Sequence, residues 1–298
     1  NRENEVTLAC RDAEQAQAIA DTGRNPRYLT DADLTGVAAT TIDDAPIAGA
    51  ELVVVAVPSA TYSSVVGSLQ GDAPILSLTK GLDPATGERL STLVRDRPVA
   101  VLSGPNIAEE IVRDLPAAAV VSSDDHLLSL DLQAAINSPT FRVYVNDDIV
   151  GVELCAAAKN VIALAAGGAD GLRLGDNAKA ALVARGLAEM GRLAVAAGGR
   201  DETFAGLAGM GDLVVTCWSQ AGRNRRAGEL IAQGAQPEEA IRAIGMVVEG
   251  LTTAPVLRDL SRRLGIELPI TEGVCAVLGG EPLHELVGNL MRREPTAE

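Results

Sequence analysis

Lysine is scarce in this chain, and one of its lysines lies in an apolar segment. The sequence has three lysines, Lys80, Lys159 and Lys179, while arginine supplies the other 22 basic groups. Lys159 lies within the apolar run 150–166, where burial disfavours the charged amine and lowers its pKa. Such an amine can donate or accept a proton near neutral pH, as the reduction of a carbonyl group requires. Lys159 is therefore a candidate proton donor and acceptor, unless its amine extends to solvent.

Polar residues that could assist such an amine follow it along the chain. Asn160 offers both a donor and an acceptor to a substrate hydroxyl. The segment 206–213 can begin a helix, which would leave Asp212 able to pair with Lys159. Three arginines then occur within the four residues 223–226 of an otherwise acidic protein. Guanidinium groups bind phosphate through two parallel hydrogen bonds, so this segment is either a phosphate site or a solvated charged face.

Two segments of the first half end predicted strands with residues that suit ligand binding. Lys80 and Gly81 follow the run 74–78, where a cationic side chain could reach a substrate or a nicotinamide. The segment 102–110 leaves another strand through a glycine and a proline, and it is either an anion-binding loop or a plain turn.

The composition excludes several classes of protein. Apolar residues make up 47% of the 298 residues and the net charge is −15, as in a packed globular protein of two domains. This acidic balance, without a basic stripe, argues against a nucleic-acid partner. Charged and polar residues interrupt the longest apolar run, and the N-terminal residues are polar, so we expect neither membrane insertion nor a signal peptide.

The cysteines and histidines point to a reduced intracellular protein without a metal site. The four cysteines are widely spaced and form no CxxC pair, which favours a cytoplasmic protein over a disulfide framework. The two histidines, His126 and His284, stand beside acidic residues in predicted helices, where we expect them at the surface. A histidine-based catalytic triad and a histidine-rich metal site are therefore not predicted.

The first half of the chain alternates strand-like and helical segments. Continuous runs rich in Val, Ile and Leu are typical of strands buried on both faces. Their alternation with helices predicts an open parallel sheet that binds ligands at the carboxyl ends of its strands. The predicted strands are 5–10, 51–57, 74–78, 99–103 and 117–122, and the predicted helices include 13–22 and 60–69.

The second half reads as entirely helical. Strand-like runs end near residues 146–148, and long Ala- and Leu-rich segments follow, with glycine pairs typical of helix ends. We therefore predict an α/β domain over residues 1–146 and an all-α domain over residues 147–298. The predicted helices here are 150–166, 177–197, 249–264 and 271–278.

A dinucleotide-binding domain opens with a strand and a GxGxxG loop, and neither occurs near the N-terminus. The glycines of the segment 209–212 follow no predicted strand. If 5–10 is the second strand of such a domain, the first strand and its loop precede Asn1. Arg11 then follows this second strand, where an arginine accommodates the 2′-phosphate of NADP, while the adjacent Asp12 suits the ribose hydroxyls of NAD.

Seven motifs in order resemble those of the bacterial-type NAD(P)-dependent glycerol-3-phosphate dehydrogenases. They are SLTKGL, LSGPNIAEEI, GVELCAAAKNVIALAAG, NAKAALVARGLAEM, TFAGLAGMGDLVVTC, GRNRRAGE and VVEG, and they span nearly the whole chain. The resemblance implies a Rossmann-type, mostly parallel sheet followed by an all-α domain. It also implies a homodimer that interconverts dihydroxyacetone phosphate and sn-glycerol 3-phosphate with NAD(P)H, for phospholipid synthesis.

The resemblance also assigns roles to individual residues. Lys159 corresponds to the family's proton donor and acceptor, and Asp212 would orient it. Substrate contacts are implied for Lys80, Gly104, Asn106, Lys159, Asn160, Asp212, Gly222, Arg223 and Asn224. Cofactor contacts are implied for Arg11, Tyr28, Lys80, Ala108, Arg223, Val247 and Glu249, with NAD or NADP as the cofactor and no metal.

Some positions depart from the family pattern. Asn106 stands where Ser or Thr is usual and Gly222 where Ser is usual, and Tyr28-Leu29 lacks the Pro-Gly that normally follows. Two alternatives stay open at this point. One is a sibling β-hydroxyacid or 6-phosphogluconate-type dehydrogenase, which also has a lysine on the first helix after its Rossmann domain. The other is a non-catalytic protein without a cofactor loop.

Overall fold

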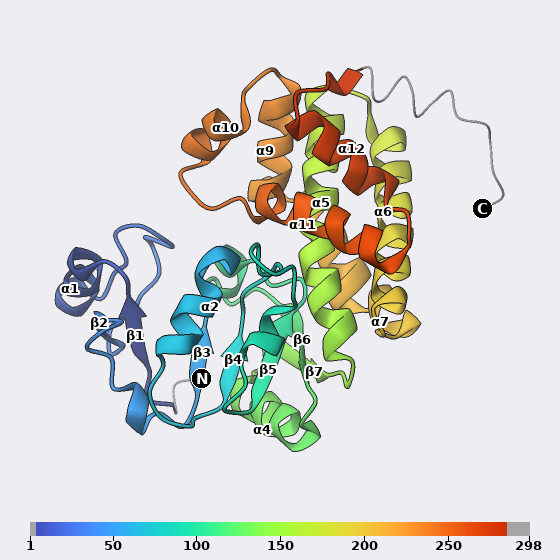
Figure 1. The fold of residues 1–298 in the computed structure, drawn as a ribbon. Helices are drawn as coiled ribbons and strands as arrows, with labels where there is room; N and C mark the ends of the chain where they lie inside the picture. The colour runs from blue at the N-terminus through green and yellow to red at the C-terminus, as the bar shows by residue number, and fades with distance from the viewer. Residues whose placement is uncertain (1–3, 285–298) are drawn as a thin grey trace.

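The strands of the N-terminal half form two separate sheets (Figure 1). The computed structural model, which describes residues 4–284, pairs β1 (Thr7–Cys10) in parallel with β2 (Ala38–Thr41). The second sheet has the order β3-β4-β5-β6-β7, in which only the β5–β6 pair is antiparallel. Its strands are Val53–Val55, Ile75–Ser77, Val99–Ser103, Ala117–Ser123 and Phe141–Val145.

The predicted α/β half is confirmed, but two of its strands were not predicted. None of the residues of β2 is buried, and only Val143 is buried in β7. Such strands lack the continuous apolar run that marks a strand buried on both faces.

Helices cover both faces of the larger sheet. Adjacent residues of a strand point to opposite faces. Accordingly, Ile75 packs with Tyr62 of α2 (Ser59–Ser68) on one side, while Leu76 packs with Leu132 of α4 (His126–Ile136) on the other. The remaining elements of this half are α1 (Ala13–Thr22), η1 (Ile47–Gly49), η2 (Leu90–Leu93) and α3 (Ala108–Ile111).

The second half is built around one long helix, α5 (Ile149–Gly171), which follows the end of β7 at Val145 (Figure 1). Asp148 caps this helix and accepts hydrogen bonds from the backbone N–H groups of Gly151 (2.8 Å) and Arg200 (2.7 Å). The other elements are α6 (Asp176–Ala196), α7 (Asp201–Ala205), the π-helical turn η3 (Leu207–Gly211), α8 (Asp212–Trp218), α9 (Arg223–Ala232), α10 (Pro237–Ile244), α11 (Glu249–Leu264) and α12 (Pro269–Leu278).

By length and composition alone, α5 could cross a membrane, and it is the single helix of this kind among residues 4–284. However, 89% of its most apolar stretch is buried by the rest of the protein. Residues of α5 such as Val161 and Ile162 pack with Leu193 of α6 and Leu257 of α11. The apolar character of α5 is therefore accounted for by its place in the core.

A buried carboxylate ties the two halves together. Glu153 of α5 accepts hydrogen bonds from the backbone N–H of Ser91 (2.9 Å), from its hydroxyl (2.5 Å) and from the guanidinium of Arg89 (2.7 Å). Burial raises the pKa of Glu153, against the opposing effect of Arg89. This contact anchors the segment before β5 to the helix that carries Lys159.

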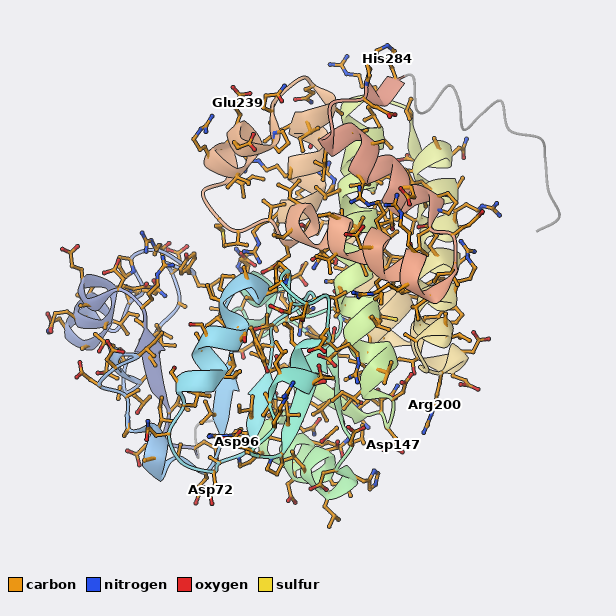
Figure 2. The ribbon with its side chains drawn as sticks, viewed as in Figure 1. Asp72, Asp96, Asp147, Arg200, Glu239 and His284 are labelled. Atoms are coloured by element: carbon orange, nitrogen blue, oxygen red, sulfur yellow. The ribbon has the colours of Figure 1, made fainter. Side chains whose placement is uncertain are left out.

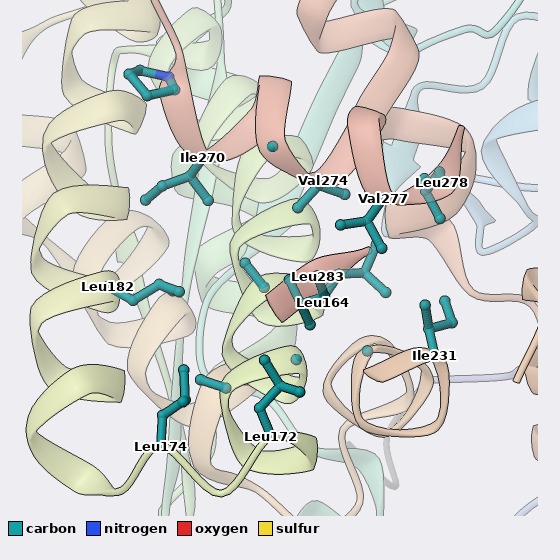
Figure 3. Close-up of a pocket in the computed structure, with 16 residues that line it drawn as sticks. Leu164, Leu172, Leu174, Leu182, Ile231, Ile270, Val274, Val277, Leu278 and Leu283 are labelled. Carbon is teal, nitrogen blue, oxygen red and sulfur yellow. The ribbon is translucent and has the colours of Figure 1, made fainter. Parts of the chain in front are cut away.

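An apolar cavity of about 100 Å³ lies between α5, α6, α9 and α12 (Figure 3). Figure 3 shows Leu164 of α5, Leu172 just after α5, Leu182 of α6 and Val274 of α12 pointing into it. Its wall carries no ionisable side chain, so this cavity is a feature of helix packing.

Candidate active site

Four segments distant in the sequence meet beside the carboxyl ends of β4 and β5. Lys80 follows β4 and Gly104 follows β5, while Lys159 lies in the middle of α5 and Asp212 is the first residue of α8. Lys159 and Asp212 are 5% and 2% exposed, respectively. The parallel strands β4 and β5 thus present their carboxyl ends to the core helix of the second half. Ligands bind at such strand ends in open α/β sheets.

The carboxylate of Asp212 lies between two amines. Its Oδ1 accepts a hydrogen bond from Lys159 Nζ at 2.5 Å, and its Oδ2 accepts one from Lys80 Nζ at 2.7 Å. The predicted pairing of Asp212 with Lys159 is therefore present, and Lys80 joins the same carboxylate. One negative charge faces two potential positive charges in a buried site.

This arrangement shifts the pKa of Lys159 into the physiological range. Burial and the neighbouring charge of Lys80 lower it to about 7, against the opposing effect of Asp212. For Asp212, burial alone would raise the pKa, but the two lysines outweigh it and the pKa is lowered. Lys159 can therefore exchange its proton near neutral pH while Asp212 stays ionised.

Two hydroxyl groups complete the surroundings of this pair and were not predicted. Thr216 Oγ1 lies 2.9 Å from Lys159 Nζ and donates its proton to the backbone carbonyl of Asp212, so it can only accept from the amine. Ser103 Oγ donates to Asp212 Oδ2 at 3.4 Å. The spacing of four residues between Asp212 and Thr216, one helical turn, is the signal that could have identified Thr216.

Lys80 also binds the loop after β5. Its Nζ donates to the backbone carbonyl of Gly104 at 3.3 Å and to Asn106 Oδ1 at 3.2 Å. Gly104 has φ +134°, and a Cβ there would lie 3.0 Å from the backbone of Ala119. A glycine is therefore required for the loop to approach the neighbouring strand this closely.

A second set of polar contacts begins at Asn160, the residue after Lys159 on α5. Asn160 Oδ1 accepts a hydrogen bond from Asn224 Nδ2 at 3.0 Å, and Asn224 Oδ1 accepts one from the backbone N–H of Gly250 at 2.8 Å. These contacts hold the first turn of α9 against α5. No side chain caps α9, whose N-cap is Gly222, so its first N–H groups are available to an anion.

The arginine cluster divides into inward and outward side chains. Arg223 and Arg226 are exposed, whereas Arg225 is buried beside Asp170 of α5, with 2.7 Å between Arg225 Nε and Asp170 Oδ2. Arg225 is therefore not part of a solvated charged face, and its guanidinium group is engaged by Asp170. The turn of the helix directs its side chain to the core.

The residues assigned to the cofactor are more dispersed. Glu249, at the start of α11, accepts hydrogen bonds from the backbone N–H (3.1 Å) and the hydroxyl (2.6 Å) of Ser59, just after β3. Arg11 directly follows β1 and is exposed, and Tyr28, Ala108 and Val247 are also exposed. All of these stay predictions for cofactor contact.

Comparison with known proteins assigns the chain to a family. Models of the N-terminus and the C-terminus of NAD-dependent glycerol-3-phosphate dehydrogenase match residues 1–128 and 148–287. A glycerol-3-phosphate dehydrogenase [NAD(P)+] of Moorella thermoacetica is 48% identical, over 98% of this chain and 90% of the relative. This chain belongs to the NAD-dependent glycerol-3-phosphate dehydrogenase family.

Further relatives agree with this assignment. A glycerol-3-phosphate dehydrogenase [NAD(P)+] of a Thermoanaerobacter species is 43% identical over 99% of this chain and 92% of the relative. The crystal structure of a glycerol-3-phosphate dehydrogenase from Coxiella burnetii superposes with a TM-score of 0.93 at 36% identity, covering 98% of this chain and 93% of that one. A ketopantoate reductase from Ralstonia eutropha shares only the fold, with 19% identity and a TM-score of 0.59. The sibling and non-catalytic alternatives are therefore not favoured.

The departures from the glycerol-3-phosphate dehydrogenase pattern have different structural settings. Asn106 uses its side-chain oxygen to accept from Lys80, as a hydroxyl in its place could. At Gly222, a Cβ would lie 3.0 and 3.1 Å from the carbonyl oxygens of Thr216 and Ser219. Glycine therefore suits the closely packed entry to α9.

The residues present fit the NAD(P) cofactor of glycerol-3-phosphate dehydrogenases. Strands β1, β3 and β4 are followed by Arg11, Ser59 and Lys80, which offer cationic and hydrogen-bonding groups where such a sheet receives a dinucleotide. Asp12 caps α1 through the N–H of Glu14 (3.0 Å) and lies 3.4 Å from Arg27. Its carboxylate is thus already engaged, which weakens the expectation that it selects NAD.

Neither histidine is among the residues that form the described site. His126 and His284 are both exposed, as predicted, and Figure 2 shows His284 at the periphery. His126 Nδ1 lies 2.8 Å from Oδ1 of the exposed Asp147. Within residues 4–284, no three His, Cys, Asp or Glu side chains are grouped so that they could hold a metal ion.

Proposed function

We propose that this chain interconverts dihydroxyacetone phosphate and sn-glycerol 3-phosphate, with Lys159 as the proton donor and acceptor. The observation that carries the proposal is the buried Lys159–Asp212–Lys80 group, in which one amine has its pKa lowered to about 7. Asn160, the residue after Lys159, is hydrogen bonded to Asn224 in the uncapped first turn of α9, whose N–H groups suit a phosphate.

The proton transfer follows from this geometry. A nicotinamide cofactor, when bound, would supply the hydride for the carbonyl carbon and would accept it in the reverse direction. Lys159 gives its proton to the carbonyl oxygen, and Asp212 and Thr216 hold the amine by accepting two of its hydrogen bonds. A third N–H, or the lone pair of the neutral amine, then remains for the substrate.

The substrate contacts divide into a carbon-chain group and a phosphate group. Around the carbonyl and hydroxyl groups we place Lys80, Gly104, Asn106 and Asn160, which converge on the site through the contacts of Lys80 and α5. The phosphate is assigned to the start of α9, where Gly222, Arg223 and Asn224 lie. Binding of the phosphate then positions the carbonyl carbon and oxygen for reaction.

We further propose that the two halves of the chain have different functions. Residues 1–146 bind NAD or NADP, and residues 147–298 supply the substrate site and Lys159. Contacts with the cofactor also come from Arg223, Val247 and Glu249, and the Ser59–Glu249 hydrogen bonds support a cofactor site shared by both halves. The enzyme acts in the cytoplasm as a homodimer, and its product supplies phospholipid synthesis.

The reaction is tested by following NADH and NADPH oxidation with dihydroxyacetone phosphate and with unphosphorylated dihydroxyacetone. We expect rapid turnover only with the phosphorylated ketone, because the phosphate supplies binding energy that dihydroxyacetone lacks. The cofactor that is oxidised faster, NADH or NADPH, identifies which of the two the site near Arg11 prefers. Absence of turnover with either ketone would direct the search to the hydroxyacid dehydrogenases.

The pKa of Lys159 predicts opposite pH dependences for the two directions. Reduction requires the protonated amine, so kcat/KM for dihydroxyacetone phosphate should fall as the pH rises through about 7. Oxidation requires the neutral amine, so kcat/KM for sn-glycerol 3-phosphate should rise over the same range. Initial rates on both sides of pH 7 provide the measurement, and parallel profiles in the two directions would contradict the role of Lys159.

A further inference from the structure

A largely buried charge cluster is centred on Asp170 of α5, beyond the proposed catalytic lysine. Asp170 is eleven residues after Lys159, about 16 Å further along the helix at 1.5 Å per residue, so it is outside the reacting group. Its carboxylate oxygens lie 3.0 and 2.7 Å from Lys179 Nζ of α6, and its Oδ2 lies 2.7 Å from Arg225 Nε of α9. The side chains of Lys179 and Arg225 are only 6% and 8% exposed. Asp170 is thus shared by cations from two other helices.

The backbones of α5 and α9 also touch at this point. A Cβ on Gly167 would lie 1.8 Å from the carbonyl oxygen of Arg225, and one on Gly228 would lie 1.9 Å from the carbonyl oxygen of Leu164. Only glycine allows the two helices to come this close. The first turn of α9 is therefore held at Arg225 in two ways, by the backbone contact at Gly167 and by the ion pair with Asp170.

This anchored turn also carries the residues assigned to the phosphate. Arg223 and Asn224 immediately precede Arg225, and Asn224 is itself bonded to Asn160 of α5. A rotation of the first turn of α9 would therefore move the exposed Arg223 side chain and the uncapped N–H groups together. The position of the phosphate site depends on how firmly Arg225 is fixed.

We propose that Asp170 is a positioning residue for the phosphate-binding turn, acting through Arg225. This inference rests on the proposed function, because it assigns the phosphate of the substrate to the start of α9. Lys179 has a different part. Its amine shares in neutralising the carboxylate of Asp170. The same amine lies over the ring of Trp218, with 5.1 Å between Nζ and the ring centroid.

The chain offers a matched pair of variants for the test. Arg225→Met and Lys179→Met each remove one cation and leave Asp170 paired with the other, so neither leaves the carboxylate unpaired. Only Arg225→Met breaks the link to α9. The double variant Asp170→Asn with Lys179→Met breaks the same link from the other end and avoids an unpaired lysine. It also leaves Arg225 in place, which separates the link from any direct effect of the guanidinium on the phosphate.

The measurements are the steady-state constants for dihydroxyacetone phosphate and for dihydroxyacetone, and the calorimetric Kd of dihydroxyacetone phosphate for enzyme saturated with oxidised cofactor, a pair that cannot react because both partners are oxidised. We expect Arg225→Met and the double variant to raise KM and Kd for the phosphorylated ligands by about tenfold or more, with kcat changed less than about threefold. Lys179→Met should keep both within about twofold of the wild type. The kcat/KM for dihydroxyacetone should not change, because this ketone has no phosphate.

The outcomes separate the inference from the proposed function. Unchanged KM and Kd in Arg225→Met and in the double variant would overturn the positioning role, even if both variants unfold at a lower temperature. An equal loss of kcat/KM with both ketones would also overturn it, because the effect would then lie at the reacting group. A wild-type enzyme without turnover of dihydroxyacetone phosphate would instead overturn the proposed function.

Discussion

Replacing Lys159 by methionine should lower kcat for dihydroxyacetone phosphate reduction by a factor of about 10²–10⁴, the usual contribution of a positioned acid. Methionine keeps much of the length of the side chain but has no proton to give. The fold should persist, because Asp212 keeps its hydrogen bond from Lys80. Steady-state kinetics with each nicotinamide cofactor, together with cofactor titration, provides the measurement. Cofactor affinity should stay near that of the wild type.

Two controls make this result specific. Lys179 is as buried as Lys159, at 5% exposure, but it lies in the charge cluster with Asp170. Lys179→Met should therefore keep kcat, although it too removes a buried amine. Lys159→Arg should lose kcat as Lys159→Met does, because a guanidinium stays protonated and cannot exchange a proton near neutral pH. Near-normal kcat in Lys159→Met would remove Lys159 from the mechanism.

Replacing Asp212 by asparagine should reduce both stability and activity. It leaves two lysines facing each other in a buried site, and loss of one partner from a buried ion pair typically costs about 3–5 kcal/mol of unfolding free energy. The carboxylate also opposes the lowering of the Lys159 pKa, so its loss should take that pKa below about 7. Reduction needs the protonated amine, so its kcat/KM should begin to fall at a lower pH than in the wild type.

Denaturant unfolding and pH profiles of reduction test both effects. Asp148→Asn is the matched control, because Asp148 is a similarly buried carboxylate (4% exposed) that caps α5 outside the site. It should lose stability and keep the pH profile of the wild type. An Asp212→Asn enzyme whose pH profile of reduction is unshifted would show that Asp212 does not affect the pKa of Lys159.

Several features could be predicted from local sequence because their causes are local. The apolar runs identified five strands of the α/β half, and the Ala- and Leu-rich segments identified α5, α6, α11 and α12. An amine in the middle of an apolar helix is costly wherever that helix packs, so Lys159 was recognisable as a functional candidate. The strands β2 and β7 were not predicted from the sequence, because they are too exposed to contain a continuous apolar run.

The directions of individual side chains were decided by the tertiary structure. Arg223 and Arg225 are two residues apart in one cluster, yet the turn of α9 exposes the first and buries the second against Asp170. Nothing in the spacing of the sequence showed that Lys80 and Lys159 share the carboxylate of Asp212, since 132 residues separate Lys80 from Asp212.

The sequence by itself therefore determined the order of an α/β half and a helical half, the family, and the identity of the amine able to transfer a proton. Those properties depend on the periodicity of apolar residues and on the energetic cost of burying charge, which act within one segment. The tertiary structure alone decided which hydroxyl groups surround Lys159, that Lys80 shares the carboxylate of Asp212, and how α9 is anchored to α5. These contacts join distant segments, and they depend on how closely the helix and sheet backbones approach each other.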